Sequence, residues 1–424
     1  WVSDADVNDV LIELKDVNGS RTGWQYTTAD AVVETYSATG QLLSIRDKTG
    51  LTQILTYSDT ATPGSIAPRA GLLIRVADHF GRALNFTYDA NARIETMSDP
   101  SGGTFGYSYD PANNLAAVTF PDGKTRQYLY NEKIYTSNAE LPSALTGIID
   151  ENGIRYATYQ YNAAGKPISS EHAGGVDKFQ LSYTTDAQGN PLSTSVTDPL
   201  GSIRTSHFER VQGVFRNIGT DQPGGSGCAS AANAQTYDLN GNVATRTDFN
   251  GGVTSYSYDT KRNLELNRTE AVGTPQARSI TTSWHAIYRV PLKIAEPKQM
   301  TTFTYDAAGN MLTKTQQATT DATGAAGLAA TVTGAARTWK FTYNTLGQVL
   351  TVDEARTDVL DKTIYSYDNV TGNLTSITNA VGHSTAISNY DAHGRAGRVI
   401  DPNGVVVDLT YTPRGWLRTM AVTH

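Results

Sequence analysis

The chain has 424 residues, a formal net charge of −7 at pH 7 and only 18% charged residues, with 38 Gly and 23 Tyr. Soluble domains average about 25% charged residues, so this composition favours a turn-rich β protein over a helical one. The acidic balance and the scattered Lys and Arg argue against nucleic-acid binding. The single cysteine, Cys228, excludes an internal disulfide, and no apolar run reaches the roughly 18 residues of a membrane helix.

The first third already shows a repeat. Tyr36-Ser-Ala-Thr-Gly40 is followed by Asp47-Lys-Thr-Gly50 and closes at Tyr57, 21 residues after the first Tyr. An Asp at the first position of a turn bonds its own backbone two residues on, and a Gly at the fourth tolerates the conformation that a type I turn leaves. Each such motif therefore predicts a chain reversal. The same unit recurs in residues 88–109 and 109–130.

The most regular unit is residues 237–259, YDLNGNVATRTDFNGGVTSYSYD. Between its two turn motifs lie segments of six or seven residues rich in Val, Thr and Tyr, the size and composition of strands. Its Asp residues are 10 and 11 positions apart, inside the window of about 8 to 12 residues that marks a meandering antiparallel sheet. Tyr256 and Tyr258 are two apart, so their rings project from one face.

Residues 284–305 form a less obvious unit, in which Trp284 replaces the opening Tyr and Glu296-Pro-Lys-Gln299 replaces the middle turn. If this is a true repeat, the replacement is also a reversal, and Phe303 and Tyr305 face the same way. The last third continues the pattern with units that begin at Tyr305, Tyr343, Tyr367, Tyr390 and Tyr411.

We predict one continuous β-strip over residues 1–424. Because the pattern is already running at Trp1 and still running at His424, both ends look like cuts in a longer protein. Three segments interrupt the pattern and are predicted to be surface loops, on their Gly, Pro, Ala and Ser content: 58–71, 221–235 and 316–336.

The predicted fold class is all-β, with tandem hairpins that form a long, curved antiparallel sheet strip. A strand every ten or eleven residues gives at most about 40 strands, and open sheets rarely exceed about 10 to 15 without curling or closing. The residues thus favour a curved wall and leave open whether it closes. The residues that define the repeat are Tyr88, Asp89, Tyr109, Asp110, Tyr237, Asp238, Gly241, Asp248, Gly251, Tyr258, Asp259, Tyr305, Asp306, Gly309, Tyr367, Asp368, Tyr390, Asp391 and Gly394.

The unit Tyr-Asp-x-x-Gly, with Leu or Ile beyond the Gly, a later Asp-x-x-Gly and a closing Tyr-x-Tyr, resembles the YD repeat of bacterial Rhs proteins. The same repeat type occurs in insecticidal toxin complexes and in animal teneurins. The resemblance covers most of the chain and is closest over residues 207–312. It implies a spiral, shell-like β-wall that encloses a C-terminal toxin. This chain departs from the family pattern because it contains neither the Rhs-associated core motif nor a toxin domain.

Asp198-Pro-Leu-Gly201 is the most tempting catalytic candidate, because Rhs cores carry an aspartyl self-cleavage motif with a similar string. The same string type occurs at Asp99-Pro-Ser-Gly102 and Asp401-Pro-Asn-Gly404, always at the middle turn, where Pro favours a type I turn. Aspartic chemistry also needs a second carboxylate close enough to share a proton, and no spacing indicates one. We therefore interpret these motifs as turns.

No other catalytic or ligand-binding pattern emerges. The seven His show no metal-ligand spacing, and the closest pair in the sequence, His383 and His393, is predicted to lie one on a strand and one in a turn. Cys228 has no His near it in sequence, so a loop thiol is favoured over a catalytic one. We expect no metal, no cofactor and no enzymatic activity.

The Tyr pairs have two interpretations. In the first interpretation, the Tyr rings form aromatic ladders along successive strands that bind sugars or an unfolded cargo chain. In the second, the rings hold the sheet together, at about 0.2 to 1 kcal/mol per cross-strand pair. The structural interpretation is favoured.

Two functions from different classes follow. The first is a non-enzymatic shell segment of a secreted bacterial Rhs-type toxin, whose partners are the C-terminal effector of the same parent and proteins of a secretion apparatus, with type VI secretion and interbacterial competition as the expected context. The alternative is a cell-surface adhesion protein that binds glycans or a partner cell. The sequence beyond His424 separates the two, because a core motif and toxin favour the shell and an anchor favours adhesion.

Overall fold

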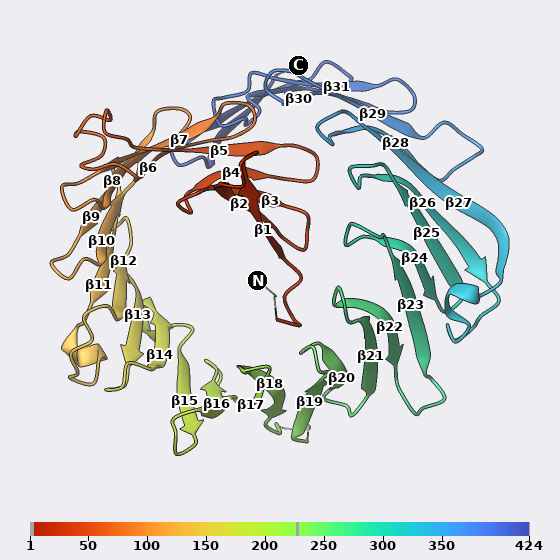
Figure 1. Ribbon diagram of the computed structural model, residues 1–424, viewed down its shortest axis with the longest axis horizontal. Coiled ribbons are helices and arrows are strands. Elements are labelled where there is room, and N and C mark those ends of the chain that lie inside the picture. The colour runs from red at the N-terminus through yellow and green to blue at the C-terminus, as the bar shows by residue number, and fades with distance from the viewer. Residues whose placement is uncertain (1–3, 226–228, 424) are drawn as a thin grey trace. The chain divides into compact units, whose positions relative to one another are not determined.

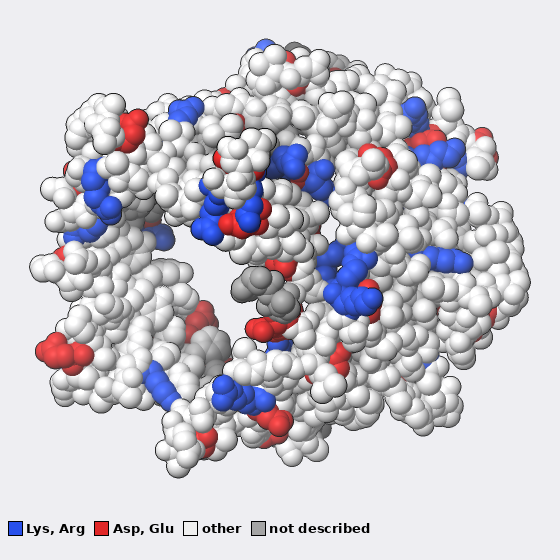
Figure 2. Space-filling model, viewed as in Figure 1, with Lys and Arg blue, Asp and Glu red and all other residues white. Residues whose placement is uncertain are grey.

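The computed structural model describes residues 4–225 and 229–423, and these residues are almost entirely β-structure (Figure 1). They contain 34 strands, assigned to one antiparallel sheet, and three short 3₁₀ turns, with no α-helix among them. The all-β prediction is confirmed. No helix in the described residues is long and apolar enough to cross a membrane. Figure 2 shows Lys, Arg, Asp and Glu dispersed in small groups over the face in view.

The chain divides into two compact units. Unit 1 comprises residues 1–103, 257–269 and 275–424, and unit 2 comprises residues 104–256 and 270–274.

In unit 1, consecutive strands pair antiparallel from β1 to β8 and again from β23 to β34. The first run is β1 (Val10–Lys15), β2 (Arg21–Thr27), β3 (Val33–Ser37), β4 (Leu42–Arg46), β5 (Thr52–Tyr57), β6 (Leu73–Ala77), β7 (Ala83–Tyr88) and β8 (Ile94–Ser98). The second run is β23 (Arg278–Trp284), β24 (Pro291–Glu296), β25 (Gln299–Tyr305), β26 (Met311–Thr319), β27 (Val332–Tyr343), β28 (Val349–Asp353), β29 (Lys362–Tyr367), β30 (Leu374–Thr378), β31 (Ser384–Ser388), β32 (Arg398–Ile400), β33 (Val406–Tyr411) and β34 (Leu417–Thr423), with η3 (Gly327–Ala329) between β26 and β27.

Unit 2 follows the same rule of consecutive antiparallel pairing. Its strands are β9 (Thr104–Tyr109), β10 (Leu115–Thr119), β11 (Thr125–Tyr130), β12 (Leu145–Ile149), β13 (Arg155–Tyr161), β14 (Pro167–His172), β15 (Phe179–Thr185), β16 (Pro191–Thr197), β17 (Ile203–Val211), β18 (Val214–Gln222), β19 (Ala231–Tyr237), β20 (Val243–Thr247) and most of β21 (Val253–Asp259). It also holds η1 (Lys133–Tyr135) and η2 (Ala173–Gly175), while β22 (Leu264–Glu270) belongs to unit 1 except for its last residue.

The apolar core of the strip is thin. Among the described residues, few apolar side chains are fully buried, and most of them are small; they are Ala67, Ala83, Val118, Ala157, Leu264, Ala295 and Met300. A sheet with so little buried apolar surface must depend on its ladders and turns for order, because hydrophobic stabilisation scales with the apolar area removed from water.

The unit over residues 284–305 is confirmed. Glu296 pairs with Gln299 across a two-residue connection. Lys298 has φ +62°, and Pro before a residue of positive φ is the signature of a type II turn. The rings of Phe303 and Tyr305 stack with centroids 6.5 Å apart, so they share a face.

Two of the predicted loops have wrong boundaries. Residues 231–235 belong to β19, and Asp221 and Gln222 to β18, so the connection is shorter than 221–235; residues 226–228, including Cys228, lie outside the described residues. Residues 316–319 and 332–336 are strand as well. The Ala, Gly and Thr content suggested a loop, but Thr is a good strand former and here pairs in register with the neighbouring strand. Residues 58–72 connect β5 to β6.

Candidate functional site: clamped turns and the seam between them

Most of the repeat turns are held by the side chain of an Asp at their first position. Asp238 Oδ1 accepts the backbone N–H groups of Asn240 at 2.9 Å and Asn242 at 2.8 Å, while Gly241 N–H donates to the Asp238 carbonyl at 3.0 Å. Gly241 has φ +77°, so a type I turn continues into a left-handed Gly, the three-residue hairpin connection. The same two bonds to the Asp carboxylate form at Asp47, Asp78, Asp89, Asp99, Asp150, Asp186, Asp198, Asp248, Asp306, Asp391 and Asp401.

The remaining repeat-defining Asp and Gly residues lie in related turns. Asp110 accepts the N–H of Asn114, Asp259 that of Lys261, and Asp368 opens a turn one residue longer. Gly251, Gly309 and Gly394 have φ of +81°, +79° and +79°, in agreement with the turn prediction.

Hydrogen bonds lower the pKa of two of these carboxylates, Asp89 and Asp306. The Arg93 side chain and backbone N–H lower the pKa of Asp89. At Asp306 burial raises the pKa, but the bonds from the Asn310 side chain and backbone outweigh it and the net pKa is lowered. A carboxylate that accepts these hydrogen bonds stabilises the turn.

Asp198, the candidate for self-cleavage, has the same arrangement. Its Oδ1 accepts the N–H groups of Leu200 and Ser202, both at 2.9 Å. Its charged neighbour is Arg204, whose guanidinium lies 3.9 Å from Oδ2. Aspartic chemistry requires a carboxylate that shares a proton with a second carboxylate, whereas the charged neighbour here is a guanidinium. The absence of enzymatic activity stays a prediction.

The Tyr of the repeat makes a second recurring hydrogen bond. We call this bond the Tyr clamp, and the Asp bonds of the turn the Asp clamp. The ladder between β6 and β7 stops at the pair Arg75 and Asn85, so the Leu73 carbonyl lies beyond its end, and Tyr88 Oη donates to that carbonyl at 2.7 Å. The hydroxyl thus closes the gap where two strands diverge. Equivalent bonds join Tyr57 to Leu42, Tyr130 to Leu115, Tyr161 to Leu145, Tyr183 to Pro167, Tyr237 to Asn217, Tyr305 to Pro291, Tyr343 to Met311, Tyr390 to Leu374 and Tyr411 to Ala396.

Trp284 makes the same kind of bond. Its indole Nε1–H donates to the Glu265 carbonyl at 2.8 Å, which explains why Trp can replace Tyr at this point of the repeat. Burial raises the pKa of Tyr305 and of Tyr390, as expected for hydroxyls enclosed in the sheet. The other predicted repeat residues, Tyr109, Tyr258 and Tyr367, lie at the end of β9, in β21 and at the end of β29.

Sequence reasoning missed a contact between distant turns of unit 1, which we call the turn seam. It joins an early row of middle turns, at 47–50, 78–82 and 99–102, to a late row of Tyr-Asp turns, at 306–309, 344–347, 368–372 and 391–394. Lys48 Nζ donates to the Gly309 carbonyl at 3.0 Å, and His393 Nε2 lies 3.2 Å from Asp99 Oδ2. In Figure 1 the early row belongs to strands β4 to β8, in red-orange to orange, and the late row to strands β25 to β31, in teal to blue.

The two rows of the turn seam advance in step. Thr49 lies against Gly347, 298 residues later; Phe80 lies against Gly372, 292 residues later; Asp99 meets His393, 294 residues later. In these three contacts, successive early turns meet successive late turns in the same order.

The pair of Asp99 and His393 is the polar centre of the turn seam. The Asp99 side chain is 8% exposed. Burial raises the pKa of Asp99, but bonds from the Ser101 hydroxyl, the Gly103 N–H and His393 lower it below its ordinary value. Arg395 Nη2 lies 3.1 Å from His393 Nδ1, and since a guanidinium only donates, Nδ1 accepts and Nε2–H donates to Asp99.

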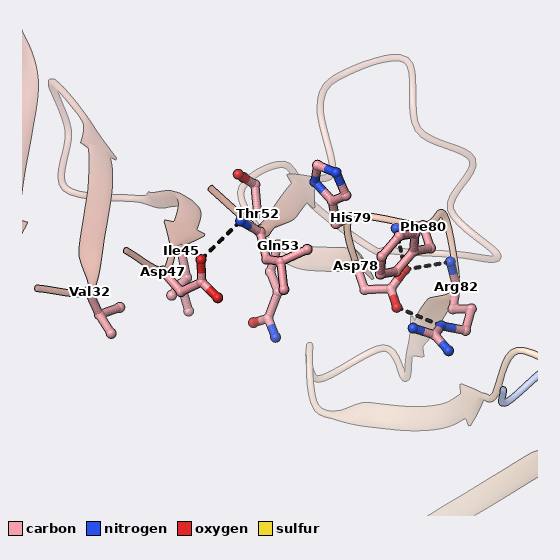
Figure 3. A pocket seen from close by; sticks show the side chains of 10 residues that line it. Val32, Ile45, Asp47, Thr52, Gln53, Asp78, His79, Phe80 and Arg82 are labelled. Atoms are coloured by element: carbon pink, nitrogen blue, oxygen red, sulfur yellow. Dashed lines mark hydrogen bonds and ion pairs between the residues drawn. The ribbon is translucent and has the colours of Figure 1, made fainter. Parts of the chain in front are cut away.

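A pocket of about 340 Å³ lies beside the early row, lined by Val32, Ile45, Leu51 and Phe80 among others. Figure 3 shows its side chains from close by. Two of its polar groups bond within their own turn: Arg82 Nε donates to Asp78 Oδ2 at 2.6 Å. Over residues 4–225 and 229–423, no group of three or more His, Cys, Asp or Glu is placed to hold a metal ion.

Comparisons with known proteins agree with this geometry. Residues 96–125, which hold two middle turns and one Tyr-Asp turn, match the RHS repeat model. No curated protein sequence matches the chain.

Two crystal structures share the fold. TcdB2-TccC3-TEV is 15% identical with a TM-score of 0.58, and the match covers 97% of this chain and 22% of that one. TcdB2-TccC3-Cdc42 is 14% identical with a TM-score of 0.57, covering 97% and 25%. The chain therefore spans about a quarter of the length of these solved chains.

Proposed function

We propose that this RHS-repeat protein, which has the fold of the TcdB2-TccC3 chains, is a stretch of wall in a shell that encloses a toxin domain of the same parent. The observation that carries the proposal is the turn seam. A single-layer strip becomes a continuous barrier only if its edges contact one another, and in unit 1 two rows of turns do so through Lys48, Phe80 and Asp99.

The clamped turns suit this role. Each unit is ordered by its own Asp and Tyr bonds, so a wall grows by adding units without needing a thick apolar core. The polar groups of the repeat make structural hydrogen bonds: Asp carboxylates accept bonds from backbone N–H groups, and Tyr hydroxyls donate bonds to backbone carbonyls. This favours a non-enzymatic wall, and it favours the structural interpretation of the Tyr rings.

The solved relatives support a cargo at the C-terminal side. One of them was crystallised as TcdB2-TccC3 without its hypervariable C-terminal region. By analogy, the partner proposed for this chain is a C-terminal effector of its own parent, and the proposed destination is outside the producing cell. Delivery by a type VI apparatus and action against other bacteria belong to the proposal as well.

The test is a protease-protection experiment on the full-length parent. The effector in the intact particle should resist added protease at least tenfold longer than the same effector expressed alone. A control cleaves the particle first at an engineered site in the wall, after which protection should disappear. Equal digestion of enclosed and free effector would rule out the shell and favour the adhesion alternative.

A further inference from the structure

We propose that residues 4–103 are a releasable strap of unit 1, held to the late row by the turn seam alone, and that Gly347, Gly372 and Gly394 of the late row are the sockets that receive it. The inference rests on the proposed wall function for its biological meaning. The docking itself is a property of this chain and is tested first.

Three glycines of the late row lie in direct contact with side chains of the strap, and we call these contact points the sockets. A Cβ added at Gly347 would come within 3.0 Å of the Thr49 side chain, at Gly372 within 3.0 Å of the Phe80 ring, and at Gly394 within 3.0 Å of the Arg82 guanidinium. Real Cβ atoms essentially never approach a neighbour so closely. These glycines are therefore needed for contact as well as for their positive φ.

Other turn glycines of the same strands provide the contrast. Gly382 and Gly404 also have positive φ, +85° and +86°, yet a Cβ at either would meet nothing within 4 Å. They belong to middle turns of the late strands, which are outside the turn seam. Positive φ and close approach are thus separable in one stretch of chain.

The contact across the turn seam consists of side chains and turns. In the described residues, the strand pairings reported for β1 to β8 and for β23 to β34 join consecutive strands, and none joins the two runs. Separation at the turn seam would therefore break no ladder, and each run would keep its own hydrogen bonds.

Packing along the turn seam is also incomplete. A cavity of about 330 Å³ lies within it, lined on the early side by Phe80, Arg82, Asp99 and Pro100 and on the late side by Ala392. Asn263 reaches the start of the strap, where its Nδ2 donates to the Ala5 carbonyl at 2.8 Å. A boundary held by scattered polar bonds and a few inserted side chains opens more readily than the ladders on either side of it.

In the proposed shell, this makes the turn seam the line along which the wall opens and exposes its contents. The strap would move as a piece, because β1 to β8 remain paired with one another.

The first test separates docking from backbone strain by hydrogen exchange on this chain. Gly372→Ala and Gly347→Ala are compared with Gly382→Ala and Gly404→Ala, which carry a similar φ cost without a docking partner. The socket variants should speed amide exchange at least tenfold in the turns at 47–50 and 78–82, and the controls should change it less than twofold. Equal exchange in both sets, or no change in the early turns, would overturn the strap.

The second test locks the strap in the parent. With Cys228→Ser as background, Thr49→Cys and Gly347→Cys are combined, because the Thr49 Cβ lies 2.9 Å from the position of a Cβ on Gly347. A disulfide needs about 3.8 Å between these atoms, a small adjustment. Either single Cys variant is the control.

Effector digestion in the oxidised double variant should be slower than in either single variant, and reduction should restore the original rate. Gly372→Ala should speed digestion and Gly382→Ala should not. If all variants protect the effector like the wild type while exchange at the turn seam changes, the wall function stands and the strap as its opening line is wrong. If wild-type parent gives no protection, the proposed function fails, and the exchange test alone decides the docking.

Discussion

The turns of unit 2 and the late turns of unit 1 share one clamp but have different surroundings. At the middle turns of unit 2, a Cβ on Gly123, Gly153, Gly201 or Gly251 would meet nothing within 4 Å. In unit 1, the equivalent atom on Gly309, Gly347, Gly372 or Gly394 would strike a side chain. The clamp is thus a local property of the Asp-x-x-Gly sequence, whereas the docking depends on which turn lies opposite. The same motif serves as a free hairpin end in one region and as a socket in the other.

The largest loss of stability should come from a β-branched residue at a turn glycine that another side chain contacts. Gly309→Val places a bulky side chain at φ +79° and within 3.0 Å of the Tyr288 ring. We expect more than the roughly 1 to 3 kcal/mol that a strained backbone position alone costs. Gly201→Val in unit 2, at φ +85° with open space around it, should cost only the strain. Denaturant unfolding of both variants measures the difference, and equal losses would show that the surroundings do not matter.

Next in size is the loss of a Tyr clamp. Tyr88→Phe leaves the Leu73 carbonyl without its hydroxyl partner, and an unpaired buried acceptor costs about 1 to 3 kcal/mol. Tyr156→Phe is the control, because Tyr156 is 50% exposed and a surface change is usually within about 0.5 kcal/mol. Hydrogen exchange near β6 should rise only in the first variant. A clamp without energetic value would give the two variants the same stability.

Acid should weaken the turn seam through protonation of Asp99. The folded pKa of Asp99 is lowered, so its stabilising contribution is present above the unfolded value of about 3.9 and is lost as pH falls through the folded pKa. Exchange at 99–102 and 391–394 should therefore rise below about pH 4. Asp99→Asn should remove that pH dependence, whereas Asp401→Asn, at a turn outside the seam, should leave it unchanged. An identical acid profile in both variants would contradict the assignment.

The smallest effect concerns a Tyr whose hydroxyl bonds a carboxylate instead of a backbone carbonyl. The bond from Tyr36 to Glu34 raises the pKa of Tyr36 to about 12. A raised pKa means that the contribution to stability is present below about pH 10 and is lost as pH rises through about 12. Absorbance titration of Tyr36 should show the late transition, and Glu34→Gln should move it toward about 10. An unchanged titration would exclude the bond.

The sequence predicts the turns and strands, which depend on neighbouring residues. It does not predict contacts between residues far apart in the chain. Asp238 and Gly241 define their turn within four residues, and even the atypical Glu296-Pro-Lys-Gln299 could be identified as a reversal from its spacing. The loop boundaries failed at 231–235, 316–319 and 332–336 because composition does not tell whether an Ala-rich or Thr-rich segment has a neighbouring strand to pair with. The turn seam joins residues nearly 300 positions apart, such as Phe80 and Gly372, and no local motif distinguishes Gly372 from Gly382.

The Tyr clamp also makes the repeat tolerant of insertions between its two strands. Tyr57 bonds the carbonyl of Leu42, 15 residues before it, whereas Tyr343 bonds that of Met311, 32 residues before it. The extra residues emerge at the opposite end of the hairpin, between β26 and β27, and the clamp forms regardless of them. A foreign peptide or small domain inserted at a middle turn such as 198–201 should therefore leave both strands in place. The repeat is in effect a scaffold with built-in insertion points, one for every pair of strands.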